Sequence, residues 1–309
     1  MRLSVIAFGL VCLCAVVIGL AAPLQDQDDV RGAFLTSRPK EKPVTSGAAK
    51  KPSRRRPKQT TAPTNSGNSN KPTDKKPPES SSSGTTVTPS TSSSSTKRVN
   101  APRIGLGLTL FMRDSNGLAV RVDPDHVFQK GDRVRVLLET NADGFLYIFN
   151  STNDGPAVMI YPHPDLDGAG NYLQAHVPFE IPSSQDAEER LRWFAFDENG
   201  GTERLFFVFT REPLSGVPID DDLIALCKES KEKCPVRPST EVWAVVQKQM
   251  QEPLKTDKAK QFGGAQTVTE EQATSRGLGL SKEDPPPSLV MMASSPRSTL
   301  VATLDLIHK

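Results

Sequence analysis

The chain has 309 residues, of which 36% are hydrophobic and 24% charged, and its formal net charge at pH 7 is only +2. This length allows one or two domains. Residues 39–97 consist mainly of Ser, Thr, Pro, Lys, Gly and Asn, which excludes a hydrophobic core there and leaves residues 103–309 to fold as a single domain.

An apolar run from Leu3 to Ala21 follows Arg2 and precedes a short acidic stretch. This pattern is typical of a secretory signal peptide, and the small residues Gly19 and Ala21 favour cleavage after residue 21. An uncleaved N-terminal helix is the alternative, because the run is about as long as a membrane-spanning helix needs. Both readings predict an extracytoplasmic chain, either secreted or periplasmic, or anchored by that helix.

Residues 22–102 are predicted to form a disordered linker rich in Ser, Thr, Pro and Lys. Between Arg38 and Lys76 the sequence has twelve Lys and Arg but only two acidic residues, whereas the rest of the chain has more acidic than basic residues. A basic arm of this kind would suit contact of residues 38–76 with an anionic envelope surface. A soluble spacer, extended by its own charge, is the alternative. Because the arm has no aromatic residues for base stacking and the chain is exported, nucleic acid is not expected as a partner.

The domain begins with patterns typical of β-strands. Residues 132–141 alternate apolar and polar side chains, which predicts one face on a core and one in water. A turn with Asp143-Gly144 separates this run from the apolar run Phe145–Phe149, which predicts a hairpin, and a similar order recurs in residues 191–209. Further strands are expected at residues 105–112, 119–122, 157–161, 176–181, 289–292 and 299–307. The expected fold is mainly β, an antiparallel β-sandwich or open barrel.

Two helices are predicted to interrupt the strands, as an insertion at about residues 217–252. Asp220–Glu229 has acidic residues in its first turn and Lys228 near its end, as the helix dipole favours. Residues 241–251 follow the capping residues Ser239 and Thr240 and carry apolar side chains on one face. Residues 253–287 contain few large apolar side chains, and are expected to be a surface excursion that is mobile. A partly helical excursion is the alternative.

Cys227 and Cys234 are the two cysteines left after removal of the signal peptide. Their spacing is too wide for a redox Cys-x-x-Cys motif, and a second pair for zinc is lacking. In an oxidising compartment a short structural disulfide is expected. Two free thiols are the alternative.

Known catalytic motifs are not found in the sequence, and no catalytic residue is nominated. Asp165, Asp167 and Asn171 alternate with glycines in a loop whose oxygens could surround a calcium ion, although the closing Glu of a helix-loop-helix site is missing. A hairpin loop is the alternative. Calcium is therefore the only cofactor considered.

Aromatic side chains are the other candidates for binding. Phe145, Tyr147 and Phe149 share one face of a strand and are expected to be core. Tyr161 and Trp193 each have a polar edge, and are predicted to make exposed binding contacts.

Several short motifs occur in a fixed order along the domain. They are Phe128-x-x-Gly131-Asp132-x-Val134, Asp143-Gly144-Phe145-Leu146-Tyr147-Ile148-Phe149-Asn150, Tyr161-Pro162-x-Pro164, Asn171-x-Leu173, Ile181-Pro182, Gly201-x-Glu203, Arg211-Glu212-Pro213 and a closing strand that ends in His308. This order resembles the domain-of-unknown-function family 4384 over about residues 105–309. The resemblance implies an exported bacterial β-rich module, joined in some other chains to peptidase-like or kinase modules. It implies no activity, catalytic residue or ligand.

The sequence therefore predicts an exported, non-enzymatic binding or envelope-structural module on a basic arm, with an unidentified protein or glycan partner. An accessory or regulatory domain for an exported peptidase is the first alternative. A hydrolase with an unrecognised site is the second.

Overall fold

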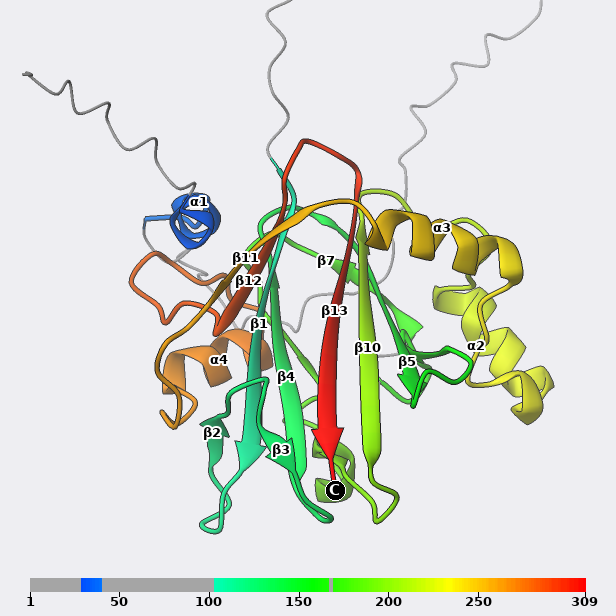
Figure 1. Cartoon of the computed structure of the whole chain (residues 1–309), viewed down its shortest axis with the longest axis horizontal. Helices are drawn as coiled ribbons and strands as arrows, with labels where there is room; N and C mark the ends of the chain where they lie inside the picture. Colours follow the sequence, from blue (N-terminus) through cyan, green and yellow to red (C-terminus); the bar gives the residue numbers. More distant parts are fainter. Residues whose placement is uncertain (1–28, 41–102, 167–168) are drawn as a thin grey trace, which may run out of the picture.

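The computed structural model describes residues 29–40, 103–166 and 169–309 (Figure 1). The predicted signal peptide and most of the predicted linker lie outside these residues. The helices are α1 (Val30–Thr36), α2 (Asp220–Glu229), α3 (Thr240–Met250) and α4 (Val268–Arg276). The strands are β1 (Gly105–Arg113), β2 (Ala119–Arg121), β3 (Val127–Phe128), β4 (Arg133–Thr140), β5 (Gly144–Thr152), β6 (Val158–Tyr161), β7 (Tyr172–Leu173), β8 (Phe179–Ile181), β9 (Phe194–Ala195), β10 (Gly201–Thr210), β11 (Leu254–Lys258), β12 (Leu289–Ala293) and β13 (Thr299–His308).

The strands form two sheets, which confirms the mainly β fold. The first sheet has the order β11-β12-β1-β4-β8, with β2 paired to β1 and β9 paired to β4. The second has the order β3-β13-β10-β5-β6, with β7 paired to β5. The pairs are antiparallel except for β3 and β13, which run parallel. The two-residue strands β3 and β7 have no sequence signal of their own, since each depends on a longer neighbour for its hydrogen bonds.

The main core lies between the two sheets. Alternate residues of β1 and β4, such as Leu108 and Val136, point into this core. They meet side chains of β5, β10 and β13 from the opposite sheet, such as Ile148, Phe207 and Leu304. Successive side chains of a strand point to opposite faces, so every second residue faces this core. This explains why apolar residues recur at every second position in the sequence.

A second core covers the outer face of the second sheet. Phe145, Tyr147 and Phe149 of β5 are all buried there, as expected. They pack with Val242 and Val246 of α3 and with residues of α2, so the helical insertion forms a layer on this sheet (Figure 1). α3 begins where Ser239 accepts a hydrogen bond from Val242 N, and its start and that of α2 agree with the sequence prediction.

The two predicted hairpins are wrong. β4 belongs to the first sheet and β5 to the second, and β9 and β10 are divided in the same way. The turns at Asp143-Gly144 and at residues 197–200 therefore carry the chain from one sheet to the other. The alternation in residues 132–141 fits a strand in either arrangement, because in both one apolar face meets the core.

The outer face of the first sheet is not in water, contrary to the prediction for residues 132–141. Arg135 and Glu139 of β4 are 5% and 3% exposed. The segment containing α4 covers Arg135, whose Nη2 donates to Gln266 Oε1 (2.9 Å), and residues 29–40 cover Glu139. Buried charges are stable only with partners, so this face is closed by polar contacts.

Residues 29–40 correct the prediction of a linker from residue 22 to 102. α1 lies against the first sheet (Figure 1). Phe34 is fully buried against Val290 and Met292 of β12. Asp29 caps the helix by accepting a hydrogen bond from Gly32 N (2.8 Å). A helix of seven residues among polar residues is too short to show a clear periodicity in the sequence, and its stability depends on its contacts with the domain.

Residues 253–287 follow the partly helical alternative rather than the mobile one, and they also include a strand. β11 pairs with β12 along residues 254–258. α4 begins with a capping box, in which Thr267 and Glu270 bond to each other's backbone N–H, and ends at Gly277 in the left-handed conformation (φ 64°). These residues are ordered by caps and strand pairing rather than by large apolar side chains.

Cys227 at the end of α2 and Cys234 form the expected disulfide, with their Cα atoms 5.1 Å apart. We expect the double substitution Cys227→Ser, Cys234→Ser to lower the free energy of unfolding by about 2.5 kcal/mol, the loop-entropy value for a closed loop of this length. Urea unfolding of the oxidised and reduced chains measures this effect. The reduced native chain should match the double variant, and equal stability of its oxidised and reduced forms would contradict the prediction.

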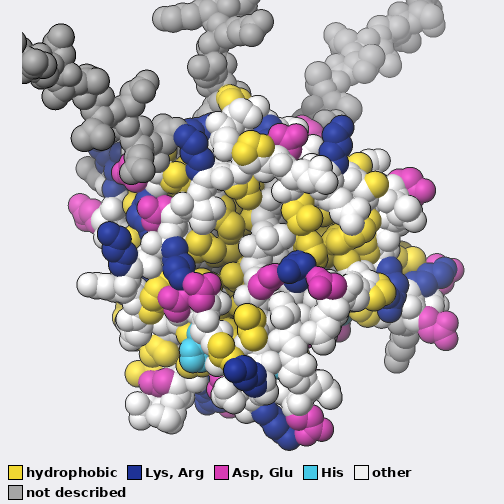
Figure 2. Space-filling model, viewed as in Figure 1, with side chains coloured by type: hydrophobic (Ala, Val, Ile, Leu, Met, Phe, Trp, Pro, Cys, Tyr) yellow, Lys and Arg dark blue, Asp and Glu magenta, His cyan; other side chains and the backbone are white. Residues whose placement is uncertain are grey.

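None of the helices formed by the described residues has the length and apolar character needed to span a lipid bilayer. On the face seen in Figure 2, Lys and Arg side chains lie next to Asp and Glu side chains. The described residues on this face therefore form no broad basic patch.

Candidate functional site

A pocket of about 290 Å³ opens between the two sheets near the end of β13. Its walls come from both sheets, with Val134 and Val136 of β4 facing Leu205 of β10 and Leu306 of β13. The remaining lining residues are Asn150, Thr152, Ile160, Phe194, Ala195, Phe196, Asp197, Glu203 and His308. The pocket is thus mostly apolar with a few polar groups gathered together, which is the usual composition of a small-ligand site.

His308 is the central polar residue of this pocket. Its side chain is 3% exposed, and neither ring nitrogen has a hydrogen-bond partner among the described residues. Nε2 lies 3.7 Å from Glu203 Oε1, within ion-pair range but beyond a hydrogen bond. The imidazole ring packs against the ring of Phe196 in a tilted arrangement, with the ring centroids 5.0 Å apart. Burial of an imidazole that makes no hydrogen bond costs free energy of folding. Both ring nitrogens are therefore available for hydrogen bonds to a ligand.

Glu203 and Asn150 complete the polar end of the pocket. Glu203 Oε2 accepts hydrogen bonds from Asn150 Nδ2 (2.7 Å) and from the Thr152 hydroxyl (2.8 Å). These two bonds fix the carboxylate and leave Asn150 Oδ1 buried with no hydrogen-bond partner among the described residues. Together with Asp197, the polar groups are mainly acceptors and negative charges. The lining residues include no Lys or Arg, which favours a ligand group that is cationic and donates hydrogen bonds.

The mouth and floor of the pocket differ in exposure. Thr152, Ala195 and Asp197 are exposed, whereas His308 and Leu205 are buried. Asp197 accepts hydrogen bonds from the backbone and side chain of Asn199, which lower the pKa of its carboxyl. Its charge therefore persists at the mouth into acid solution, where it would attract a cation from solvent.

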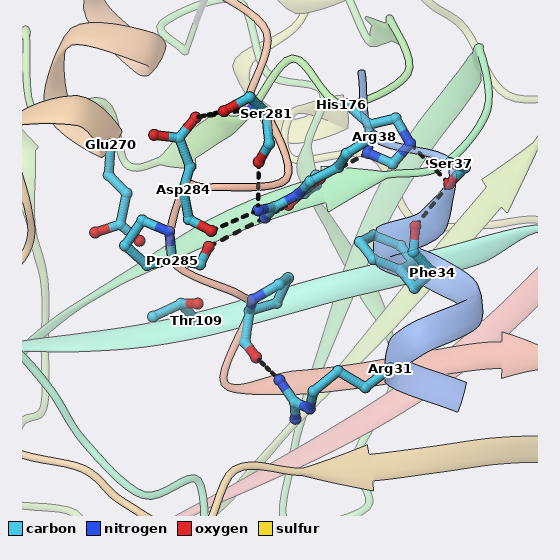
Figure 3. A network of polar contacts seen from close by, with 12 residues as sticks. Arg31, Phe34, Ser37, Arg38, Thr109, His176, Glu270, Ser281, Asp284 and Pro285 are labelled. Atoms are coloured by element: carbon cyan, nitrogen blue, oxygen red, sulfur yellow. Dashed lines mark hydrogen bonds and ion pairs between the residues drawn. The ribbon is translucent and has the colours of Figure 1, made fainter. Parts of the chain in front are cut away.

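A second group of buried polar residues joins residues 29–40 to the domain (Figure 3). The Arg38 guanidinium donates to both carboxylate oxygens of Glu139, with Nε–Oε1 2.8 Å and Nη2–Oε2 2.6 Å. His176 Nδ1 lies 2.7 Å from Glu139 Oε1, and its Nε2 lies 2.9 Å from Ser37 Oγ. We call the domain side of this group the Arg38 socket, which consists of Glu139, His176 and residues 281–285.

The order Ser37, His176, Glu139 resembles the hydrogen-bond relay of serine hydrolases. Two contacts oppose that use. The Ser37 hydroxyl is also bonded to Phe34 O (2.6 Å), and the Glu139 carboxylate is neutralised by Arg38. The relay therefore serves to hold residues 29–40 in place.

Glu139 predicts a specific dependence of stability on pH. Burial opposes ionisation of its carboxyl, but hydrogen bonds from His176 and Arg38 outweigh burial and lower its pKa below the ordinary 4.5. A lowered pKa in the folded state stabilises the protein above the unfolded pKa, and this contribution disappears as pH falls through the folded value. We expect the native chain to lose stability more steeply than Glu139→Gln below about pH 4.5. Urea unfolding from pH 7 to 3 measures the slopes, and parallel slopes would contradict the prediction.

The sequence-predicted binding residues lie elsewhere. Tyr161 is fully buried, and its hydroxyl donates to Gly170 O (2.8 Å), so the prediction of an exposed contact is wrong. Its polar edge is used inside the core. Trp193 is half-buried beneath the Arg135 guanidinium, 4.3 Å from the ring centroid, and its role in binding stays a prediction.

The predicted calcium residues are not gathered on one side of the loop. The Asp165 side chain is 85% exposed, whereas Asn171 is buried and donates through Nδ2 to Leu146 O (3.0 Å). Asp167 lies outside the described residues. Among those that are described, no group of three or more His, Cys, Asp and Glu side chains is placed to hold a metal ion. Calcium binding stays a prediction without support from the geometry.

Comparison with known proteins identifies one family. Residues 127–213 match the model of the family described as "Domain of unknown function (DUF4384)". The match confirms the predicted family from β3 to the end of β10, over a shorter stretch than the motifs implied. It includes Asn150 and Glu203 of the pocket but not His308. No curated protein and no solved structure matches the chain.

Proposed function

We propose that this chain is an exported, non-enzymatic binding module, and that the pocket between its sheets receives an alkylammonium group on an apolar stem. The observation that carries the proposal is a set of buried polar atoms beside the fixed carboxylate of Glu203. They are Oδ1 of Asn150 and both ring nitrogens of His308, and they make no hydrogen bond to the described residues. A bound ammonium would donate to Glu203 and Asn150, and its carbon stem would contact Leu205 and Leu306.

The size of the pocket supports a small ligand or one side chain of a larger partner. A volume of about 290 Å³ is at the lower end of the range for small-molecule sites. A lysine side chain of a protein partner and a free aliphatic amine present the same chemistry. Export is supported by the Cys227–Cys234 disulfide, since such bonds persist in oxidising compartments.

A binding role is favoured over catalysis by the side chains that line the pocket. The described lining contains no Ser, Cys or Lys that could act as a nucleophile, and His308 makes no hydrogen bond to the Thr152 hydroxyl or to Glu203. His308 and Glu203 are thus assigned to recognition.

Three probes of equal length test the proposal, namely hexylamine, hexanol and hexanoate. We expect the full chain to bind the amine most tightly and hexanoate most weakly, because the pocket has acceptors and negative charge. Glu203→Gln keeps the shape of the side chain but removes its charge, and should weaken amine binding by about 10- to 100-fold, the range for a hydrogen bond to a charged group. Binding is measured by ligand-observed NMR. Equal binding of all three probes, or unchanged amine affinity in Glu203→Gln, would contradict it.

The control variant is Glu198→Gln. Glu198 is a carboxylate on the same loop as Asp197, but it is 72% exposed and pairs with Lys130 outside the pocket lining. Its removal changes the net charge equally. We expect no measurable change in amine affinity for this variant.

A further inference from the structure

Residues 29–40 contact the domain, although residues 41–102 separate them from it in the sequence. Phe34 is fully buried, and its ring lies at right angles to His176, with centroids 5.7 Å apart. The strand beneath is shaped for this ring, since a side-chain carbon added at Gly105 or Gly107 of β1 would meet Phe34 at 3.0–3.2 Å. The segment therefore occupies a site to which β1 and β12 contribute.

The Arg38 socket satisfies the whole guanidinium group. Besides the two bonds to Glu139, Nη1 donates to Ser281 O (3.1 Å) and Asp284 O (2.9 Å), and Nη2 donates to Pro285 O (3.1 Å). Arginine has five N–H donors in a planar fork, and all five have an acceptor here. Lysine could not reproduce this arrangement, because its three donors radiate from one atom.

Further contacts lie on both sides of Arg38. Arg31 donates to Asp257 Oδ1 (2.7 Å) and to Pro287 O, and Lys282 N donates to Pro39 O (3.1 Å). Each acceptor or donor on the domain side belongs to residues 139–288. The contacts thus resemble those of a bound peptide more than those of a continuous strand or helix of the fold.

We propose that the Arg38 socket and the neighbouring Phe34 site form a peptide-binding surface that recognises residues 29–40 as a separable ligand. It follows that the segment of a second copy of the chain can replace the resident one. Each chain carries both the segment and the socket, so the pairing is self-complementary between copies. Residues 41–102 would span roughly 200 Å if fully extended, enough to reach a neighbouring molecule.

The resident segment competes with this exchange. A tether of this length gives an effective concentration of the order of millimolar, so the intramolecular arrangement dominates in dilute solution. Exchange is expected when the resident segment is weakened or when copies are held side by side.

Two complementary full-length variants test the proposal. Arg38→Ala has an intact socket but a defective segment, whereas Glu139→Gln has an intact segment but a weakened socket. We expect each alone to be monomeric at micromolar concentration and their mixture to contain a 1:1 complex in sedimentation velocity. Arg38→Ala mixed with the double variant Arg38→Ala, Glu139→Gln is the control, and should form none.

A peptide of residues 29–40 gives a second measurement. It should raise the melting temperature of Arg38→Ala and bind it at least tenfold more tightly than the same peptide with Arg38→Ala or Arg38→Lys. Failure of both complex formation and peptide binding in folded variants, judged by circular dichroism, would overturn the proposal. If Arg38→Ala does not fold, the wild-type chain is cut at a protease site introduced within residues 41–102. Displacement of the cut segment by excess peptide would then support exchange, and a segment that is not displaced would overturn it.

Discussion

Arg38→Ala is expected to lower the free energy of unfolding by about 3–5 kcal/mol, the cost of removing one partner from a buried ion pair. The side chains of Arg38 and Glu139 are 0% and 3% exposed, and the substitution also removes donors from three carbonyl groups, of which those of Ser281 and Asp284 are buried. If residues 29–40 detach in this variant, water can reach Glu139 and solvate its charge. The decrease in the free energy of unfolding therefore cannot exceed the free energy with which this segment binds the domain. Urea unfolding at pH 7 measures the effect.

Arg204→Ala is the matched control for this prediction. Arg204 also binds both oxygens of a carboxylate, that of Asp305, but its side chain is 36% exposed. Exposed ion pairs contribute only about 0–1 kcal/mol, because water and salt screen them. A similar decrease in the free energy of unfolding for Arg38→Ala and Arg204→Ala would contradict the description of the Arg38 socket as a buried site.

Gly144→Ala is expected to destabilise the chain by about 2–3 kcal/mol, at the upper end of the usual range for inserting a carbon into a well-packed site. A Cβ atom at this position would lie 2.4 Å from the carbonyl oxygen of Thr210 and 2.7 Å from the ring of Phe209. The first contact is with backbone, so it cannot be relieved by a side-chain rotation. Strand β5 would have to move away from β10, to which it is paired through residues 145–152.

Gly264→Ala is the control for Gly144→Ala. No atom lies within 4 Å of a Cβ placed on Gly264, and its backbone is not in the left-handed region. We expect a change within about 0.5 kcal/mol, as for surface substitutions in general. Thermal unfolding of the two variants side by side gives the comparison. Equal stability of Gly144→Ala and the native chain would show that β5 and β10 do not approach as closely as described.

The role of Gly144 illustrates what local sequence could and could not establish. Asp143-Gly144 predicts a turn, and a turn is present, but the glycine is required because β5 approaches Thr210 closely. The position of β10, distant in the sequence, sets this requirement. For the same reason the alternation of residues 132–141 predicts a strand without revealing to which sheet its neighbour belongs.

Local sequence signals are sufficient to predict the helices whose ends are fixed by neighbouring residues. The acidic first turn of α2 and the Ser239 cap of α3 predicted both helices nearly to the residue. The capping box at Thr267 and Glu270 is an equally local signal and would have identified α4 within the predicted excursion.

The candidate site depended on contacts that the sequence does not reveal. His308 is the last residue of an alternating strand, and nothing nearby in the sequence indicates that Glu203 and Asn150 lie beside it. The sequence alone places Arg38 among many basic residues of a predicted solvated arm. Its burial depends on Glu139 and on three carbonyl groups of residues 281–285, so the basic stretch proposed to contact an anionic surface loses this residue.

The most direct test of the proposed function is an NMR titration of the full chain with hexylamine that observes the histidine Cε1–H signals. The chain has four histidines, and His308→Gln identifies the signal of the one in the pocket. We expect the His308 signal to shift in a saturable way while those of His126, His163 and His176 stay unchanged, and hexanoate to shift none of them. An unchanged His308 signal at saturating amine, or equal shifts of all four signals, would contradict binding between the sheets.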